Sequence, residues 1–155
     1  MYQLEVKRWL IQHHFPPNNG WNVFVHIDPM ERAHGGQHKP DKATRARIAE
    51  NALKNIGATI GTHPRYGRTD IVAIHPDKET FIGEVEGDSS RQKDQAIYSA
   101  LGQLVLKMQG GEEKFFLAVP DQPAWEYQIQ RIPPYAKALL NLSFLFVSER
   151  KVREE

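Results

Sequence analysis

Apolar spacing predicts a helix followed by three strands from residue 41 onward. One apolar stripe indicates a helix that begins after Asp41 and ends at Gly57, where a left-handed glycine cap fits. Three segments rich in β-branched and aromatic residues then read as strands, separated by turn residues. These strands are expected at residues 58–64, 68–76 and 79–87.

The second half of the chain continues this regular pattern. A second apolar stripe, ending at Gly110-Gly111, predicts a long helix. KFFLAVP, residues 114–120, is almost wholly apolar, which is typical of a central strand. Helical material is expected over residues 122–141, broken at Pro133-Pro134, with a last strand at 142–148. The chain is therefore expected to form an α/β fold, a central mixed sheet with helices on both faces.

The first 40 residues fall outside this order. They predict a helix at 2–14, a short strand at 21–28 and a polar loop at 29–40. We expect one domain, because 155 residues suffice for a single core. Within it we expect residues 1–40 to be an N-terminal embellishment, 41–120 the regular core, and 121–155 a C-terminal helix and strand.

Composition narrows the class of protein. The chain has a formal net charge of +1 and no cysteine, so disulfide frameworks and thiolate metal sites are excluded. Its first 14 residues carry charges inside the apolar stretch and do not form a signal peptide. No apolar run is long enough to span a membrane. We expect a cytoplasmic protein without a membrane partner.

The chemistry is concentrated in the strand at 79–87. Glu84 and Glu86 share one face of this strand, and Asp70 on the preceding strand falls next to them when the two strands pair. Burying unpaired carboxylates is costly, and converging acids repel one another. A hard cation such as Mg²⁺, which binds carboxylate oxygens, would compensate them. Glu50, on the preceding helix, could add another carboxylate.

Motif and element order together resemble a known superfamily. GRTDIVAI, then GEVEG with 13 residues between Asp70 and Glu84, then a helix reading QAIYSALGQL, is similar to the PD-(D/E)xK nucleases. The resemblance covers about residues 41–120. It implies the restriction-endonuclease-like fold, whose core is helix, three strands, helix, strand. It also implies a Mg²⁺-dependent deoxyribonuclease that hydrolyses DNA phosphodiester bonds, with Mn²⁺ as a substitute, acting in restriction, repair or recombination.

The resemblance assigns roles to particular residues. Asp70 and Glu84 match the two metal-binding acids, and Glu50 matches the helical acid that many members place before the sheet. Supporting positions on the following helix are Gln95, Tyr98 and Gln103.

Glu86 departs from the superfamily pattern, which usually has lysine at this position. Three interpretations stay open. Glu86 can accept a proton or bind a second cation; a basic residue of the next helix, Lys93 or else Arg91, can reach the site; or the site has lost activity and only binding remains.

Basic residues are placed where a nucleic acid would need them, and DNA is the expected partner. The residues assigned to this contact are Arg45, Arg65, Arg68 and Arg91. The resemblance also implies a homodimer, since many such nucleases cut two strands as dimers. The alternative function is an inactive module of the same fold that binds nucleic acid or protein. A hydrolase using the two glutamates as acid and base is less favoured.

Overall fold

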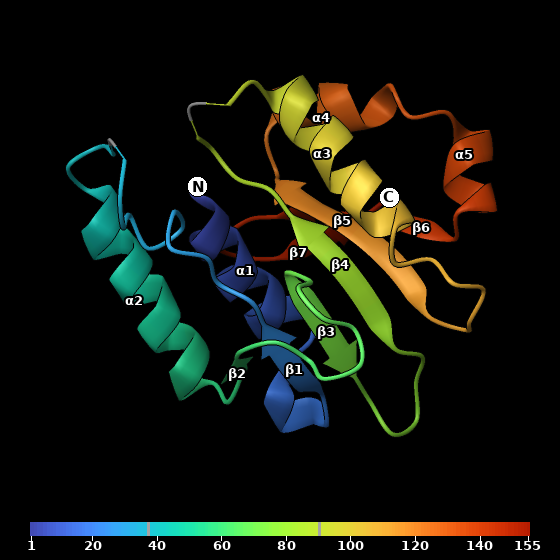
Figure 1. Cartoon of the computed structure of the whole chain (residues 1–155), viewed down its shortest axis with the longest axis horizontal. Helices are drawn as coiled ribbons and strands as arrows, with labels where there is room; N and C mark the ends of the chain where they lie inside the picture. Colours follow the sequence, from blue (N-terminus) through green and yellow to red (C-terminus); the bar gives the residue numbers. More distant parts are fainter. Residues whose placement is uncertain (37, 90) are drawn as a thin grey trace.

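A mixed sheet organises the whole fold (Figure 1). The computed structural model describes residues 1–36, 38–89 and 91–155, and over these residues the sheet has seven strands in the order β2-β1-β3-β4-β5-β6-β7. The predicted α/β class, with a mixed sheet flanked by helices, is confirmed. None of the helices in this described part combines the length and apolar character needed to cross a membrane.

Each element has definite bounds. The strands are β1 (Asn22–Val25), β2 (Thr59–Ile60), β3 (Ile71–Ile74), β4 (Phe81–Val85), β5 (Lys114–Pro120), β6 (Leu142–Val147) and β7 (Val152–Glu154). The helices are α1 (Gln3–His14), α2 (Lys42–Asn55), α3 (Lys93–Val105), α4 (Pro123–Gln130) and α5 (Pro134–Leu139), with a 3-10 turn at Pro17–Asn19.

Strand directions divide the sheet into two parts. β1, β3 and β4 form an antiparallel meander in which Ile71 of β3 pairs with both Val25 and Gly83. β4, β5 and β6 are parallel neighbours, and β7 returns antiparallel to β6. The start of β3 and the end of β4 therefore lie side by side at one end of the sheet.

Alternation along the strands separates two apolar layers. In β5, Phe116 and Ala118 belong to one apolar cluster with residues of α1 and α2, whereas Phe115 and Leu117 belong to another with residues of α3 and α4. The same alternation sends Val85 of β4 into the α1 layer and Ile82 into the α3 layer. Figure 1 shows α1 and α2 on one side of the sheet and α3, α4 and α5 on the other.

The first 40 residues differ from the expected N-terminal embellishment. α1 packs directly against the sheet, with Leu4, Leu10 and Ile11 at most 1% exposed. β1 lies inside the sheet, between β2 and β3. This part of the chain therefore belongs to the core, because one whole face of the sheet would otherwise be exposed to water.

The segment at 58–64 was expected to be a strand, but only Thr59 and Ile60 form one there. They pair with the outer side of β1. The strand beside β3 is β1. Gly57 does adopt the expected left-handed conformation at the end of α2, with φ of +98°.

Candidate carboxylate site

Asp70 lies at the centre of a group of charged side chains at the end of the β3–β4 pair. It directly precedes β3, one residue beyond the Ile71–Gly83 pair, which places it beside Glu84. Its Oδ2 accepts a hydrogen bond of 2.9 Å from the backbone N–H of Val85. The meander predicted from the sequence therefore does bring Asp70 and Glu84 together.

Lys7 of α1 is the cation closest to Asp70. Its side chain is fully buried, and its Nζ lies 3.1 Å from Asp70 Oδ1, 2.6 Å from Glu31 Oε1 and 2.6 Å from the carbonyl oxygen of His26. Burial alone would lower the pKa of Lys7, but Asp70 and Glu31 hold it above its ordinary value. The ammonium is therefore a fixed internal positive charge.

Burial is the largest influence on Asp70 and opposes its ionisation. The charge of Lys7, a hydrogen bond with Glu84 and the N–H of Val85 together outweigh it and hold the pKa of Asp70 below its usual value. Gln3 of α1 adds a longer contact, with Nε2 3.4 Å from Asp70 Oδ2. Asp70 is therefore an ionised carboxylate held by contacts from α1 and β4.

Glu84 lies on the face of β4 that points to the α3 layer. It is 3% exposed, and its Oε1 has no hydrogen-bond partner among the described residues. The ammonium of Lys107, just after α3, is 3.9 Å from this oxygen. Burial, followed by the negative charge of Asp70, raises the pKa of Glu84 to about 10. An acid so placed binds either a proton or another cation at neutral pH.

Glu86 directly follows β4, two residues after Glu84. Burial and the charge of Asp70 raise its pKa to about 7, and the nearby Arg91 partly offsets this effect. Glu31 has its pKa raised to about 7 as well, mainly by burial. Perturbed carboxylates concentrated in this way are typical of functional sites.

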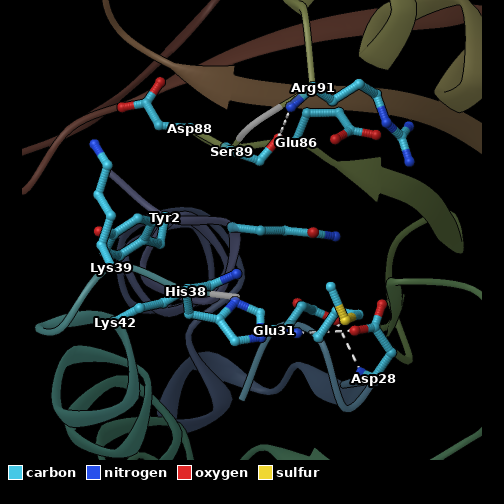
Figure 2. Close-up of a pocket in the computed structure, with 13 residues that line it drawn as sticks. Tyr2, Asp28, Glu31, His38, Lys39, Lys42, Glu86, Asp88, Ser89 and Arg91 are labelled. Atoms are coloured by element: carbon cyan, nitrogen blue, oxygen red, sulfur yellow. Dashed lines mark hydrogen bonds between the residues drawn. The ribbon is translucent and has the colours of Figure 1, made fainter. Parts of the chain in front are cut away.

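A cavity of about 440 Å³ opens beside Glu31 and Glu86. It lies between the start of α1, residues 28–31 and 38–42, and residues 86–89 with Arg91. Figure 2 shows Glu86 and Arg91 on one side of this pocket, and Asp28 and Glu31 on the opposite side. The pocket therefore borders the acid group at Glu31 and Glu86, whereas Asp70 and Glu84 do not line it.

Glu50 does not join this group. Its carboxylate pairs with Arg32, 2.7 Å away, and with Lys54, 3.3 Å away. It lines a different cavity, of about 410 Å³, next to α2. Since α2 packs against α1 and β2 rather than over β3 and β4, the position expected for a helical acid beside Asp70 is taken by residues of α1.

The residues predicted on α3 also lie away from the acids. Lys93 is 3.8 Å from Asp88 and lies over the ring of Trp125, so it does not reach Glu86. The hydroxyl of Tyr98 accepts a hydrogen bond from Arg131, and the tyrosine is 49% exposed. The two glutamines predicted as supporting residues, Gln95 and Gln103, are exposed on α3.

The four arginines expected to bind DNA are spread over the molecule. Arg45 is held by Glu5, 2.6 Å away, and Asp41, 3.1 Å away. Arg65 is 3.9 Å from Glu113, near the start of β4, the end of the sheet opposite Glu86. Arg68 is exposed. Of the four, Arg91 alone lines the cavity beside the acids.

A divalent cation fits part of this arrangement. In the described residues, no three His, Cys, Asp or Glu side chains converge as a metal-binding group. Asp70 and Glu84 nevertheless form a neighbouring pair, and Glu84 offers a buried oxygen without a hydrogen-bond partner. Mg²⁺ commonly uses only one or two carboxylates and keeps several waters. The donor set therefore fits Mg²⁺ at this pair.

Sequence reasoning missed Lys7, Glu31 and Lys107. Lys7 had a visible signal, because it falls on the same helical stripe as the buried Leu4 and Ile11, where a lysine is unexpected. Glu31 lies in the polar segment after β1, and nothing in its local sequence indicates burial.

Comparison with known proteins gives no match: no family model, no curated protein and no solved structure is significantly similar to this chain. Its function must therefore be inferred from the chemistry of the site.

Proposed function

We propose that the chain is a Mg²⁺-dependent deoxyribonuclease, with Asp70 and Glu84 as the carboxylates that hold the cation. The observation that carries this proposal is the buried Oε1 of Glu84 beside the ionised Asp70: this oxygen has no hydrogen-bond partner among the described residues, and the ammonium of Lys107 is 3.9 Å away. Leaving a buried acceptor unsatisfied is costly, and such groups in a native site are often explained by an ion. Mn²⁺ is the expected substitute.

The element order supports the same proposal. Read without α2 and β2, the chain runs α1, β1, β3, β4, α3, β5, which is helix, three antiparallel strands, helix, and a strand parallel to the third. This is the order expected of a restriction-endonuclease-like core. In this reading α1 and β1 begin the core, and α2 and β2 are an insertion between its first and second strands.

The side chains around the pair have distinct roles in this mechanism. Lys7 keeps Asp70 ionised, so one carboxylate is always available. Glu86, whose pKa is raised to about 7, can accept a proton from an attacking water near neutral pH. Arg91, on the same cavity, can contact the phosphate. A bound Mg²⁺ would stabilise the charge that develops in an in-line displacement at phosphorus.

Cleavage of labelled DNA, duplex and single-stranded, tests the proposal. We expect cleavage in Mg²⁺ or Mn²⁺ and none in EDTA. Asp70→Asn should reduce cleavage by more than about 10–100-fold. That range is typical for loss of a residue that hydrogen-bonds a metal ligand, and Asp70 is proposed to be a ligand itself. Asp77→Asn, the same change in the exposed turn between β3 and β4, should retain full activity. Equal activity of Asp70→Asn and the Asp77→Asn control would exclude this site.

The second candidate is a non-catalytic module that binds DNA. One observation favours it: the ammonium of Lys7 already bridges Asp70 and Glu31, so part of the negative charge is neutralised without a metal. This alternative predicts retention on DNA with the same affinity in EDTA and in Mg²⁺, and no cleavage of duplex, single-stranded or branched substrates.

A further inference from the structure

The cavity beside the acids has the size of a small-ligand site. Its volume of about 440 Å³ falls within the roughly 300–1,000 Å³ common for such sites. One nucleotide fits a space of this kind. A paired duplex does not, because its major groove alone is about 12 Å wide.

Two of the four acidic residues that line the cavity, Glu31 and Asp88, are compensated within the protein. Glu31 lies 2.6 Å from the buried Lys7. Asp88 accepts a hydrogen bond of 3.2 Å from the indole N–H of Trp125 and lies 3.8 Å from Lys93. These two acids therefore present little uncompensated negative charge to a ligand. Asp28 and Glu86 also line the cavity, on other sides of it than Lys39 and Lys42 (Figure 2).

The lysines of the opposite wall are not compensated in this way. Lys39 is exposed and Lys42 half-buried, and neither has an ion-pair partner within the described part of the chain. Tyr2 directly precedes α1, and its ring has the Lys42 ammonium at 5.8 Å and the Arg45 guanidinium at 4.4 Å. Its hydroxyl donates a hydrogen bond of 3.0 Å to Asp41. Figure 2 shows Tyr2, Lys39 and Lys42 together on one side of the pocket. Cationic side chains beside an aromatic ring are the elements that bind single-stranded nucleic acid.

The two lysines come from the segment between β1 and β3, which also carries α2, and Tyr2 directly precedes α1. We propose that the cavity binds one unpaired nucleotide of a DNA strand, with Lys39 and Lys42 on its phosphates and Tyr2 against its base. The preferred substrate is then a strand end, an overhang or a single strand. The proposal rests on the proposed function only for the step after binding, namely delivery of the adjacent phosphodiester to Asp70 and Glu84.

Fluorescence anisotropy in EDTA tests binding without cleavage. The probe is a labelled single strand of about 12 nucleotides, within the site sizes of about 4–16 nucleotides known for single-strand binders. A blunt hairpin duplex of the same base composition is the comparison. The variants are Lys39→Ala/Lys42→Ala and a matched control with the same loss of charge, Lys54→Ala/Lys78→Ala, at the C-terminal end of α2 and in the β3–β4 turn.

We expect the single strand to bind more tightly than the duplex. Lys39→Ala/Lys42→Ala should weaken that binding about tenfold and reduce the salt dependence of log K by about 1.4, from two phosphate contacts. The control should change binding less than twofold. Tyr2→Leu should weaken single-strand binding and leave duplex binding unchanged.

Equal affinity for duplex and single strand, or equal effects of the two double variants, would overturn the proposal. Binding as predicted, with no cleavage in Mg²⁺, would instead reject the nuclease and leave the binding site in place. Failure of the nucleotide-binding proposal and failure of the nuclease proposal therefore give different results.

Discussion

Lys7 and Asp70 form an ion pair that joins α1 to the start of β3, with Nζ 3.1 Å from Oδ1. Lys7 is fully buried and Asp70 has a side chain that is 13% exposed. Because Glu31 contacts the same ammonium, three distant parts of the chain meet at one buried charge. The stability of the fold and the ionisation of the site are thus coupled through one lysine.

Lys7→Met should destabilise the protein strongly. It leaves Glu31 and Asp70 as buried charges without their partner, which typically costs about 3–5 kcal/mol. Urea unfolding at neutral pH measures the loss. Lys54→Met, which removes a 55% exposed lysine, should change the free energy of unfolding by at most about 1 kcal/mol.

Lys7→Met/Glu31→Gln should recover part of the loss, because one of the stranded charges is then absent. A decrease in the free energy of unfolding below about 1 kcal/mol for Lys7→Met would contradict the environment assigned to this lysine, since removing a buried cation from two carboxylates is strongly destabilising.

The metal-free protein should become less stable as pH rises from about 4.5 to 7. Burial raises the pKa of Glu86 from 4.5 to about 7, so in this window the folded state holds a proton that the unfolded state has released. Stability then falls with rising pH. Glu86→Gln should remove on the order of 2 kcal/mol of this fall.

Denaturation in EDTA at several pH values measures this slope. Glu112→Gln, at an exposed glutamate, serves as the control and should keep the wild-type slope. If Glu86→Gln also kept it, the environment assigned to Glu86 would be incorrect.

Substitutions at two glycines test how tightly β4, which carries Glu84, packs against β5. A Cβ at Gly83 would lie 2.2 Å from the ring of Phe116, so Gly83→Ala should destabilise the protein by about 1–3 kcal/mol through overpacking. Gly102, in α3, has nothing within 4 Å of such a Cβ, so Gly102→Ala should be neutral or stabilising by up to about 1 kcal/mol. Thermal unfolding separates the two, and similar effects would contradict this packing of β4 on β5.

Substitution of Glu50 tests whether this acid takes part in the proposed metal site. Since it pairs with Arg32 and Lys54 rather than with Asp70, Glu50→Gln should leave Mg²⁺-dependent cleavage within about twofold of wild type, a change below about 0.5 kcal/mol in the barrier. Glu84→Gln should abolish cleavage. Loss of cleavage in both variants, at unchanged folding, would restore Glu50 to the site.

The local sequence pattern was sufficient to predict the part of the site that lies on the adjacent strands β3 and β4. Alternation along residues 68–87 and the short turn between the strands predicted that Asp70 and Glu84 would be neighbours, and both follow from local geometry. The helix after them was predicted for the same reason, from one apolar stripe.

The rest depends on contacts that are distant in sequence. β1 pairs with β3, joining Val25 to Ile71 across a segment that contains α2, and no local signal reports this pairing. Residues 1–40 were therefore expected to lie outside the regular core, which was taken to begin with the helix after Asp41. For this reason Glu50 was named as a candidate ligand and Lys7 was overlooked.

Calorimetric titration with Mg²⁺ tests the central claim most directly. Wild type and the Asp77→Asn control should bind the ion with the same affinity, and Asp70→Asn and Glu84→Gln should each bind it at least about tenfold more weakly. Mg²⁺ binding unchanged in both site variants, or absent from the wild type, would contradict a cation site at Asp70 and Glu84.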